Sequence, residues 1–215
     1  MSDDVPPEFP EPEESRLTVV ALAVAVEGGL VVAAVLVGTW LERHPLENCR
    51  FDVVGVVGGL LATVPMVLLA LLMLRYPIGP LRSIQAFSTE VIRPLLGVCT
   101  RVDLLGISCL AGLGEEMLFR GMLQDALVPH LTVWGAVALA SLLFGLLHAV
   151  TPTYAILATC AGAYLGGLYV LTNNLLAPIL SHALYDFVLL YWLIYGPGAE
   201  QAQQATQEPS DSDTL

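Results

Sequence analysis

Long apolar runs with few charges constrain this sequence more than any other feature. A membrane-spanning helix needs about 20 such residues to cross roughly 30 Å of hydrocarbon. The six candidate spans are residues 17–41, 53–74, 103–127, 131–149, 153–171 and 175–195. Hydrophobic residues make up 56% of the 215 residues and charged residues only 13%, which is too apolar for a soluble domain with one core. We therefore predict an all-α, polytopic membrane helix bundle of about six transmembrane helices.

The two ends differ in composition from the apolar middle. Residues 1–15 hold six acidic residues and four prolines, and residues 199–215 are rich in Gln, Ser, Thr and acids. These compositions predict disordered acidic tails. The expected division is a tail at 1–16, two transmembrane helices with an interfacial loop at 17–102, a catalytic membrane core of four helices at 103–195, and a tail at 196–215.

The net charge argues against a nucleic-acid partner. The formal charge of −12 comes from 20 acidic residues and 8 basic residues, all of them Arg. Residues 1–15 contribute −6 and residues 199–215 contribute −4, which leaves 10 acidic residues against 8 Arg elsewhere. Negative charge of this size repels phosphate backbones. We therefore expect no nucleic acid to bind.

The arginines predict an orientation in the membrane. The loop at 75–102 carries four Arg, whereas the loop at 42–52 carries two. Cytoplasmic loops are the ones enriched in basic residues. We therefore expect an integral, multi-pass protein of a prokaryotic plasma membrane with both termini in the cytoplasm.

The longer loop also has apolar residues at helical spacing. They are Ile84, Phe87, Val91, Leu95 and Val98. Two interpretations fit this pattern equally well, a helix lying in the membrane interface and a connector packed on the bundle.

Three charged residues stand in the middle of the third candidate span, where each is costly unless it is paired or hydrated. They are Glu115, Glu116 and Arg120, in the segment GEEMLFRG. Glu116 and Arg120 are one helical turn apart on one face and can form an ion pair. Glu115 points about 100° away from its neighbour and is left as a candidate general base. A buried charge cluster that only ties helices together is the alternative.

Two further spans carry side chains that handle protons. His148 follows Phe144 by four residues in FGLLH, and His182 precedes Asp186 by four residues in SHALYD. The members of each pair share one helix face, and each pair alone could be a satisfied buried contact. Because the membrane penalises all these polar groups, we expect both histidines, Asp186 and Glu115 to converge on one polar cavity.

Such a cavity supports hydrolysis of an amide. Glu115 would activate a water molecule, and His148 or His182 would hold the oxyanion. A second route places a divalent metal such as zinc on His148, His182 and Asp186, with an open position for water. The residue spacing does not choose between the metal-bound and the metal-free route.

GEEMLFRG, FGLLH and SHALYD occur in this order on three hydrophobic segments. Together they resemble the motifs of the CAAX prenyl protease and bacteriocin-processing (CPBP, Abi-type) family of intramembrane endopeptidases, over residues 103–190. The resemblance implies a glutamate-dependent metalloendopeptidase in which Glu115 activates water. It also implies that His148 and His182 orient water, stabilise the oxyanion or bind a metal. The supporting residues would be Glu116, Arg120, Phe144 and Asp186.

One motif position departs from the pattern of the prenyl-protein proteases, which have Asn where this chain has Asp186. An Asn amide donates a hydrogen bond to an oxyanion, whereas an ionised Asp only accepts. Asp186 therefore favours orienting His182 or holding a cation. Because the family also includes bacteriocin-processing and immunity proteins, a prenylated substrate does not follow from the resemblance.

Two other functions fit parts of the sequence. Glu27, the single acid in the first span, could belong to an ion- or proton-coupled transporter, although the two halves show no inverted repeat. A non-catalytic membrane immunity or scaffold protein could use the same bundle. The expected partners are membrane lipid and a membrane-associated protein or peptide substrate, and the oligomeric state stays open.

The predicted depths of the two histidines in the membrane differ. Counting residues from the helix ends puts His148 and His182 about 15 Å apart in depth if the helices stand upright at 1.5 Å per residue. Strong tilt, or a broken start of the last span around Asn173, Asn174 and Pro178, would remove this mismatch.

Overall fold

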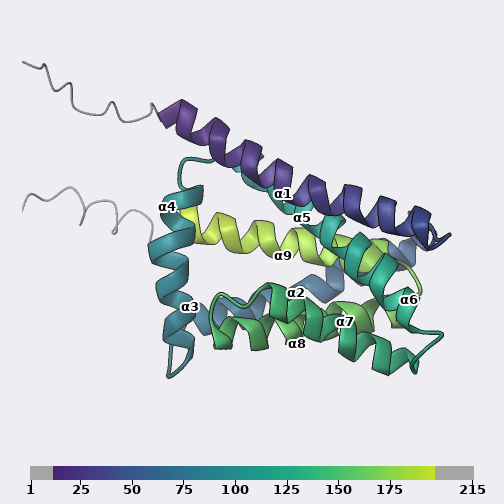
Figure 1. Ribbon diagram of the computed structural model, residues 1–215. Helices are drawn as coiled ribbons and strands as arrows, with labels where there is room; N and C mark the ends of the chain where they lie inside the picture. The colour runs from purple at the N-terminus through teal and green to yellow at the C-terminus, as the bar shows by residue number, and fades with distance from the viewer. Residues whose placement is uncertain (1–11, 197–215) are drawn as a thin grey trace, which may run out of the picture.

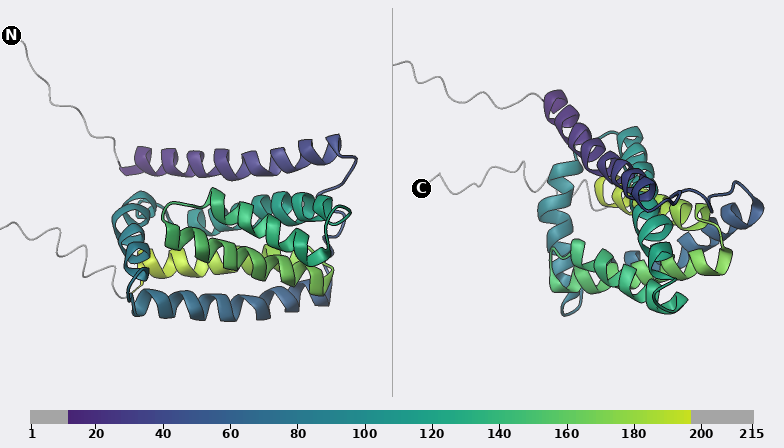
Figure 2. Two further views of the ribbon diagram at one scale, coloured as in Figure 1. Left: turned by 60° about the horizontal axis from the view of Figure 1, so that its bottom comes forward. Right: turned by 45° about the vertical axis from the view of Figure 1, so that its right-hand side comes forward.

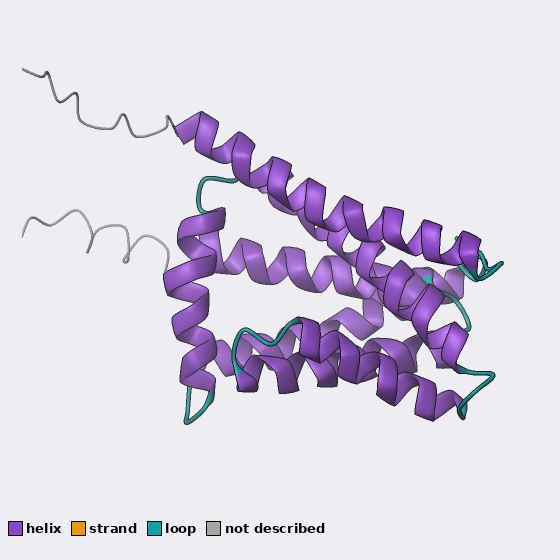
Figure 3. Ribbon diagram, in the orientation of Figure 1, coloured by secondary structure: helices purple, strands orange, loops and turns teal. Residues whose placement is uncertain are grey.

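The computed structural model describes residues 12–196, and all regular structure in that part of the chain is helical (Figure 3). The α-helices are α1 (Pro12–Trp40), α2 (Val53–Arg75), α3 (Leu81–Phe87), α4 (Arg93–Leu96), α5 (Arg101–Glu116), α6 (Asp125–Leu127), α7 (Val133–Leu147), α8 (Pro152–Thr172) and α9 (Leu176–Tyr195). Two π-helical segments, η1 (Ser88–Ile92) and η2 (Met117–Gln124), continue α3 into α4 and α5 into α6. The predicted all-α fold is confirmed for these residues. Residues 1–11 and 197–215 of the predicted tails lie outside the described part.

The predicted spans are present as helices, but they are not all full-length. By length and composition, four helices could each cross a membrane, namely α1, α2, α8 and α9. The helix from α5 to α6 reaches the length and composition of a membrane span only when it is counted together with the segment Leu81–Leu96. These two helical segments are bent by 115° relative to each other. α7 has 15 residues, or about 22 Å at 1.5 Å per residue. Of the six predicted spans, four are helices long and apolar enough to cross a membrane, or five if the bent pair counts as one span. The remaining one, α7, is a short apolar helix, and the protein is a multi-pass membrane protein.

The first helix begins earlier than the sequence composition indicates. It starts at Pro12, so residues 12–16 are helical rather than part of a tail. Two glutamates in its first turn stabilise the helix, because their negative charges lie at the positive end of the helix dipole. Arg16 then binds Asp103 at the start of α5 through two hydrogen bonds, from Nε at 2.6 Å and from Nη2 at 2.9 Å. This ion pair joins the beginnings of α1 and α5.

The long helices run roughly along one direction, and one helical segment lies across their end (Figure 1 and Figure 2). α5 and α9 pack against each other in the middle of the bundle, with α1 against α5, α2 against α9, and α7 against α8. The segment across the end consists of α3, η1 and α4, which we call the crosswise helix. The loop at 75–102 is therefore helical, and its helix contacts α1, α2, α8 and α9 at that end of the bundle.

A glycine lets the two central helices approach closely. A Cβ at Gly112 of α5 would stand 2.8 Å from the backbone nitrogen of Ala183 and 3.0 Å from the carbonyl oxygen of Ile179, both on α9. Glu115 lies one turn further along α5, and His182 precedes Ala183 on α9. Backbone contact at this glycine therefore fixes the relative position of the helices that carry Glu115 and His182.

At the other end of the bundle, Asn174 ties the loop after α1 to the turn between α8 and α9. Its amide donates to the carbonyl oxygen of Arg50 at 2.8 Å and to Asp52 Oδ1 at 2.9 Å. Its side-chain oxygen accepts from the backbone N–H of Arg50 at 3.0 Å. The turn itself places Asn173 in the left-handed region, with φ of 45°, which Asn adopts more readily than most residues. The last helix therefore begins anew after this turn, at Leu176.

Asp52 should make stability depend on pH. It caps α2 by accepting from the backbone N–H of Gly55 at 2.8 Å, and this bond, with the Asn174 amide and Arg50, lowers its pKa below the ordinary 3.8. Such a carboxyl stabilises the fold above about pH 4, and the stabilisation is lost as pH falls through the folded-state pKa. We expect Asp52→Asn to lower the thermal unfolding temperature at about pH 7 and the gap to narrow below about pH 4. Differential scanning fluorimetry in detergent measures this, and a gap independent of pH would contradict it.

Candidate active site

Glu116 and Arg120 form a buried ion pair in the span made by α5 and η2. Glu116 Oε1 accepts from Arg120 Nη1 at 2.7 Å, and the two side chains are 0% and 1% exposed. Arg120 Nη2 also donates to the carbonyl oxygen of Gly162 on α8 at 2.8 Å. A Cβ on Gly162 would stand 3.2 Å from Ser141 and 3.4 Å from Arg120 Nη2, so glycine lets α8 come close enough for this bond. The ion pair predicted from the spacing is confirmed.

His182 on α9 lies between this ion pair and Asp186. Its Nδ1 is 2.8 Å from Glu116 Oε1. Because the Glu116 carboxylate is paired with Arg120, it accepts, and Nδ1 carries the proton. The other ring nitrogen, Nε2, faces Asp186 Oδ2 at 3.4 Å and Glu115 Oε2 at 3.9 Å. The ion pair therefore fixes the ring from one side and leaves Nε2 toward Glu115.

His148 caps the C-terminal end of α7. Its Nδ1 is 2.8 Å from the carbonyl oxygen of Phe144, one turn earlier. A carbonyl oxygen only accepts, so Nδ1–H donates this bond. Nε2 is thereby directed toward α5, where it lies 3.6 Å from Glu115 Oε1. The hydrogen bond to the last turn of α7 therefore orients the His148 ring.

The depth mismatch expected between His148 and His182 does not occur. Their Nε2 atoms lie 3.6 and 3.9 Å from the same Glu115 carboxylate. The expectation assumed upright helices, whereas α7 runs obliquely to α9 (Figure 1), and α9 starts anew after the turn at Asn173 and Asn174. Residue counts from the helix ends therefore do not measure depth in this bundle.

Phe144 packs at the centre of the site. Its ring stacks on His148 with centroids 4.3 Å apart and an interplanar angle of 24°. The edge of the Phe119 ring meets it at 5.0 Å, and Arg120 Cζ lies 4.9 Å from its centroid. Stacking and cation–π contacts of this kind hold an imidazole and a guanidinium in a fixed relation. The structure thus places Phe144 as packing support for both groups.

Glu115 lacks the direct hydrogen-bond partners that the neighbouring Glu116 has. Its side chain is 10% exposed, and Oε2 has no hydrogen-bond partner among the described residues. The distances of 3.6 and 3.9 Å to the two histidines are long for direct hydrogen bonds but suit a bridging water. A carboxylate with an unused oxygen between two imidazoles can accept a proton from water.

The Glu115 carboxylate and both histidines line a cavity of about 370 Å³. The other polar residues that line it are Glu27, Ser88, Tyr154, Tyr185 and Asp186. Most of the remaining lining is apolar and comes from α2, α8, α9 and the crosswise helix. Among the residues that the structure describes, Glu115, His148, His182 and Asp186 thus share one cavity, together with a larger apolar wall.

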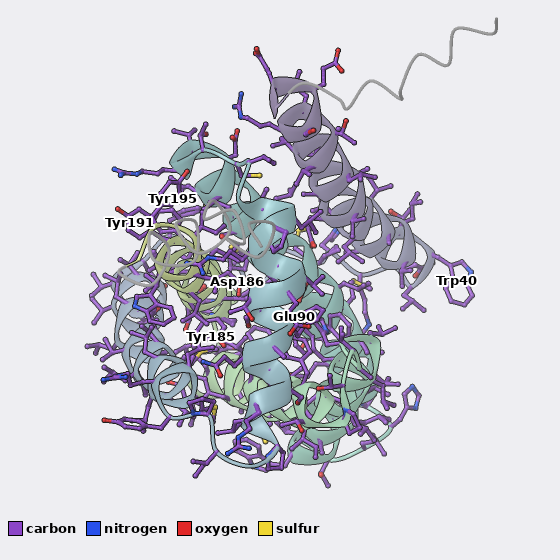
Figure 4. The ribbon with its side chains drawn as sticks, turned by 90° about the vertical axis from the view of Figure 1, so that its left-hand side faces the viewer. Trp40, Glu90, Tyr185, Asp186, Tyr191 and Tyr195 are labelled. Carbon is purple, nitrogen blue, oxygen red and sulfur yellow. The ribbon has the colours of Figure 1, made fainter. Side chains whose placement is uncertain are left out.

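The crosswise helix covers the end of this cavity. It contributes Leu81, Ile84, Phe87, Ser88 and Ile92 to the lining. None of its residues is fully buried. Figure 4 views the protein from this end, where the helix with Glu90 stands in front and Tyr185 and Asp186 belong to α9. The cavity is therefore bounded by the membrane helices and by this crossing segment.

Four polar residues of the cavity were not predicted as part of the site, namely Glu27, Ser88, Tyr154 and Tyr185. Glu27 was assigned only to the transporter alternative, although a single acid in a span is a recognisable signal. Tyr154 gave no signal, because tyrosines are common near the ends of membrane helices, and Tyr185 is a mid-helix residue between the motif positions His182 and Asp186. Only the packing of α8 and α9 around the cavity brings these phenols to Asp186 and His148.

The predicted metal ligands do not form a complete metal site. Within residues 12–196 no group of three or more His, Cys, Asp or Glu side chains is arranged to hold a metal ion. A catalytic zinc site uses three protein ligands and an open position. The arrangement does not fit that requirement, and metal binding by His148, His182 and Asp186 stays a prediction.

Comparison with known families supports one of the alternatives for this bundle. Residues 98–188 match a sequence model described as type II CAAX prenyl endopeptidase Rce1-like. Over these residues the chain is similar to the CAAX protease family. The matched stretch holds every residue predicted as catalytic or supporting, so the resemblance found in the motifs is confirmed. Neither curated proteins nor solved structures gave a match.

This match supports a CAAX-type intramembrane protease. The matched stretch begins just before α5 and ends within α9. It excludes α1, α2 and the crosswise helix, although all three contribute to the cavity wall. The family match therefore covers the motif residues, while part of the cavity belongs to this chain's own N-terminal half.

Proposed function

We propose that this protein is an intramembrane endopeptidase in which Glu115 activates water to hydrolyse a peptide bond. The observation that supports this most is the Glu115 carboxylate between the Nε2 atoms of His148 and His182, at 3.6 and 3.9 Å, on the wall of a cavity. Its Oε2 has no hydrogen-bond partner within the described part of the chain. A general base needs such a free oxygen within reach of the water.

The proposed reaction adds water to the peptide carbonyl and then expels the amine. Glu115 takes a proton from water as the water oxygen bonds to the carbonyl carbon, and the C=O π electrons move onto the carbonyl oxygen. When the intermediate collapses, the C–N bond breaks and Glu115 gives its proton to the leaving nitrogen. The products are a carboxyl group and an amine, and Glu115 is returned to its initial state.

The neighbouring residues would position the reacting groups. His148 and His182 face the place where the water would lie, each with its Nδ1–H already bonded elsewhere. The Glu116 carboxylate, held by Arg120, fixes His182 from behind. Asp186 is 3.4 Å from His182 Nε2 and would orient that ring or the water beside it. Positioning of this kind lowers the entropic part of the barrier.

We infer that the substrate is a membrane-associated peptide or protein. The cavity lies among helices that could cross a membrane, and its lining is mainly apolar. An extended peptide with apolar groups, including one with a prenyl chain, could therefore enter it from the lipid. The family description points to prenylated CAAX sequences, so both a prenylated and a plain peptide are suitable probes.

Cleavage by purified protein in liposomes tests this proposal. The probe is a fluorogenic peptide that ends in a farnesylated CAAX sequence, and the same peptide without farnesyl shows whether the prenyl group is needed. We expect His148→Ala to lower cleavage by about 10²-fold or more, because the group that orients the water is lost. The matched control, His130→Ala, changes an exposed loop residue before α7 and should keep the parental rate. Equal cleavage by His148→Ala and the parent would contradict the proposal.

A chelator separates the two routes for water activation. Cleavage that persists after chelation supports activation by Glu115 with the two histidines alone. Cleavage that is lost on chelation and restored by zinc supports a metal held by His148, His182 and Asp186.

We also propose that the end covered by the crosswise helix faces the cytoplasm, which places both termini there. The arginines at that end are Arg16, Arg75, Arg82, Arg93 and Arg101. Arg43 and Arg50 stand at the other end, in the loop after α1. Protease digestion of an N-terminal tag in inside-out but not right-side-out vesicles supports this orientation, and the reverse result contradicts it.

A further inference from the structure

The proposed peptidase needs a hydrogen-bond donor that its motif residues do not supply. Negative charge develops on the peptide carbonyl oxygen as water adds, and donors aimed at that oxygen lower the barrier. The prenyl-protein proteases that this chain resembles have an Asn in the last motif, whose amide can donate. This chain has Asp186, whose ionised carboxylate only accepts.

The two histidines do not fill this role. The Nδ1–H of His148 donates to a backbone carbonyl, and the Nδ1–H of His182 donates to Glu116, each at 2.8 Å. Their Nε2 atoms both face Glu115, and His182 Nε2 also faces Asp186. A proton on either Nε2 would therefore be directed at a carboxylate rather than at a new oxyanion. The donor has to come from another element.

Three hydroxyl groups line the cavity without a hydrogen-bond partner in the described part of the chain. They belong to Ser88 of the crosswise helix, Tyr154 of α8 and Tyr185 of α9. A tyrosine hydroxyl ionises only near pH 10, so at neutral pH it remains a donor in a site where the carboxylates only accept. The cavity thus holds a small set of candidate donors to which the peptidase motifs assign no role, although Tyr185 lies within SHALYD.

Tyr154 is the hydroxyl best placed among them. It lies in the first turn of α8, where Thr151 Oγ1 accepts from its backbone N–H at 3.1 Å. Its ring centroid is 6.4 Å from that of His148 and 6.1 Å from that of Phe87 on the crosswise helix. The ring is therefore held beside a catalytic histidine, on the side where the crosswise helix covers the cavity.

The positions of the two tyrosines separate their roles. The Tyr154 ring packs beside His148, whose Nε2 faces Glu115 Oε1 at 3.6 Å, whereas Tyr185 precedes Asp186 on α9. The hydroxyl that binds the oxyanion has to lie near the general base, because both groups act on one carbonyl. This requirement favours Tyr154 and makes Tyr185 a natural comparison.

We propose that the Tyr154 hydroxyl donates a hydrogen bond to the oxygen of the scissile carbonyl while Glu115 activates the water. This inference rests on the proposed peptidase function. As the water oxygen bonds to carbon, the C=O π pair becomes a lone pair on the carbonyl oxygen, and the phenol keeps its proton throughout. The water proton passes to Glu115 and then to the leaving nitrogen as the C–N bond breaks. Tyr154 is thus a catalytic residue that meets the developing charge, and Glu115 is the one that moves the proton.

The substitution Tyr154→Phe tests this role, because it removes one oxygen and keeps the ring contacts with His148 and Phe87. With the farnesylated fluorogenic peptide in liposomes, we expect kcat to fall by about 10²–10³-fold, as when an oxyanion donor is removed. KM should change by less than about threefold, since the bond strengthens only in the transition state. Tyr76→Phe, at an exposed tyrosine outside the cavity lining, should cleave like the parent. Tyr185→Phe and Ser88→Ala should lose less kcat than Tyr154→Phe, and all variants should unfold at the parental temperature.

The outcomes separate this inference from the proposed function. A parental kcat in Tyr154→Phe overturns the inference, as does a loss confined to KM or a larger loss in Tyr185→Phe or Ser88→Ala. Glu115→Gln is measured alongside. If Glu115→Gln cleaves as well as the parent, or if the parent does not cleave the probe, the proposed peptidase function fails instead.

Discussion

Replacing Glu115 with glutamine is expected to lower peptide cleavage by about 10²–10⁴-fold, which is the contribution of a positioned general base. Glutamine has nearly the same shape, but its amide cannot take a proton from water. The Oε2 atom that it replaces has no hydrogen-bond partner within residues 12–196, so little stability depends on it. Cleavage of the farnesylated fluorogenic peptide by parent and variant in liposomes measures the effect.

A matched control separates loss of the base from a general loss of charge. Glu47 is exposed in the loop after α1, and Glu47→Gln should cleave at the parental rate with the same unfolding temperature. A Glu115→Gln protein that retains cleavage within about threefold of the parent would show that another group activates the water.

Replacing Arg120 with leucine is expected to give the largest loss of stability, about 3–5 kcal/mol. The substitution leaves the Glu116 carboxylate fully buried without its cation, and it leaves the Gly162 carbonyl without its donor. Reversible unfolding in mixed SDS and dodecyl maltoside micelles, followed by circular dichroism, measures the free energy of unfolding. The control Arg82→Leu, on the exposed side of α3, should change that free energy little.

A double variant tests whether uncompensated charge causes that loss. In Arg120→Leu with Glu116→Gln neither member of this pair leaves a buried charge, and an amide oxygen remains for His182 Nδ1. We expect this variant to recover a large part of the stability lost by Arg120→Leu alone, because a neutral pair avoids the desolvation cost of a lone carboxylate. No recovery would mean that the loss comes from packing around the guanidinium, including its contact with Phe144.

The fold was largely predictable because a membrane imposes a simple rule on sequence. Apolar runs of sufficient length indicate helices, and the predicted segment 53–74 is nearly the same as α2, Val53–Arg75. The rule is less reliable for segments that contain charged residues. The third span carries the charged motif residues and is long and apolar enough for a membrane span only when it is counted with the crosswise helix. The first helix begins within the acidic end, at Pro12, and its Arg16 pairs with Asp103.

The motif residues were predictable because a charged group inside a membrane is costly unless it is paired or hydrated. Spacing of four residues gave the Glu116–Arg120 pair directly, since a helical turn is a local property. The meeting of His148 and His182 was not predictable, because it depends on the oblique path of α7 and on the turn at Asn173. Tyr154 reaches the cavity only through the tertiary packing of α8, for which a single tyrosine near a helix start gives no local signal.

Hydrolysis in water enriched in oxygen-18 tests the central claim most directly. Purified protein in liposomes is incubated with the farnesylated CAAX peptide, and the products are identified by mass spectrometry. The account predicts that the parent places one labelled oxygen in the new carboxyl group of the cleaved peptide, and that Glu115→Gln yields almost no labelled product. Equal labelling by parent and variant, or an intact peptide after incubation with the parent, would contradict the account.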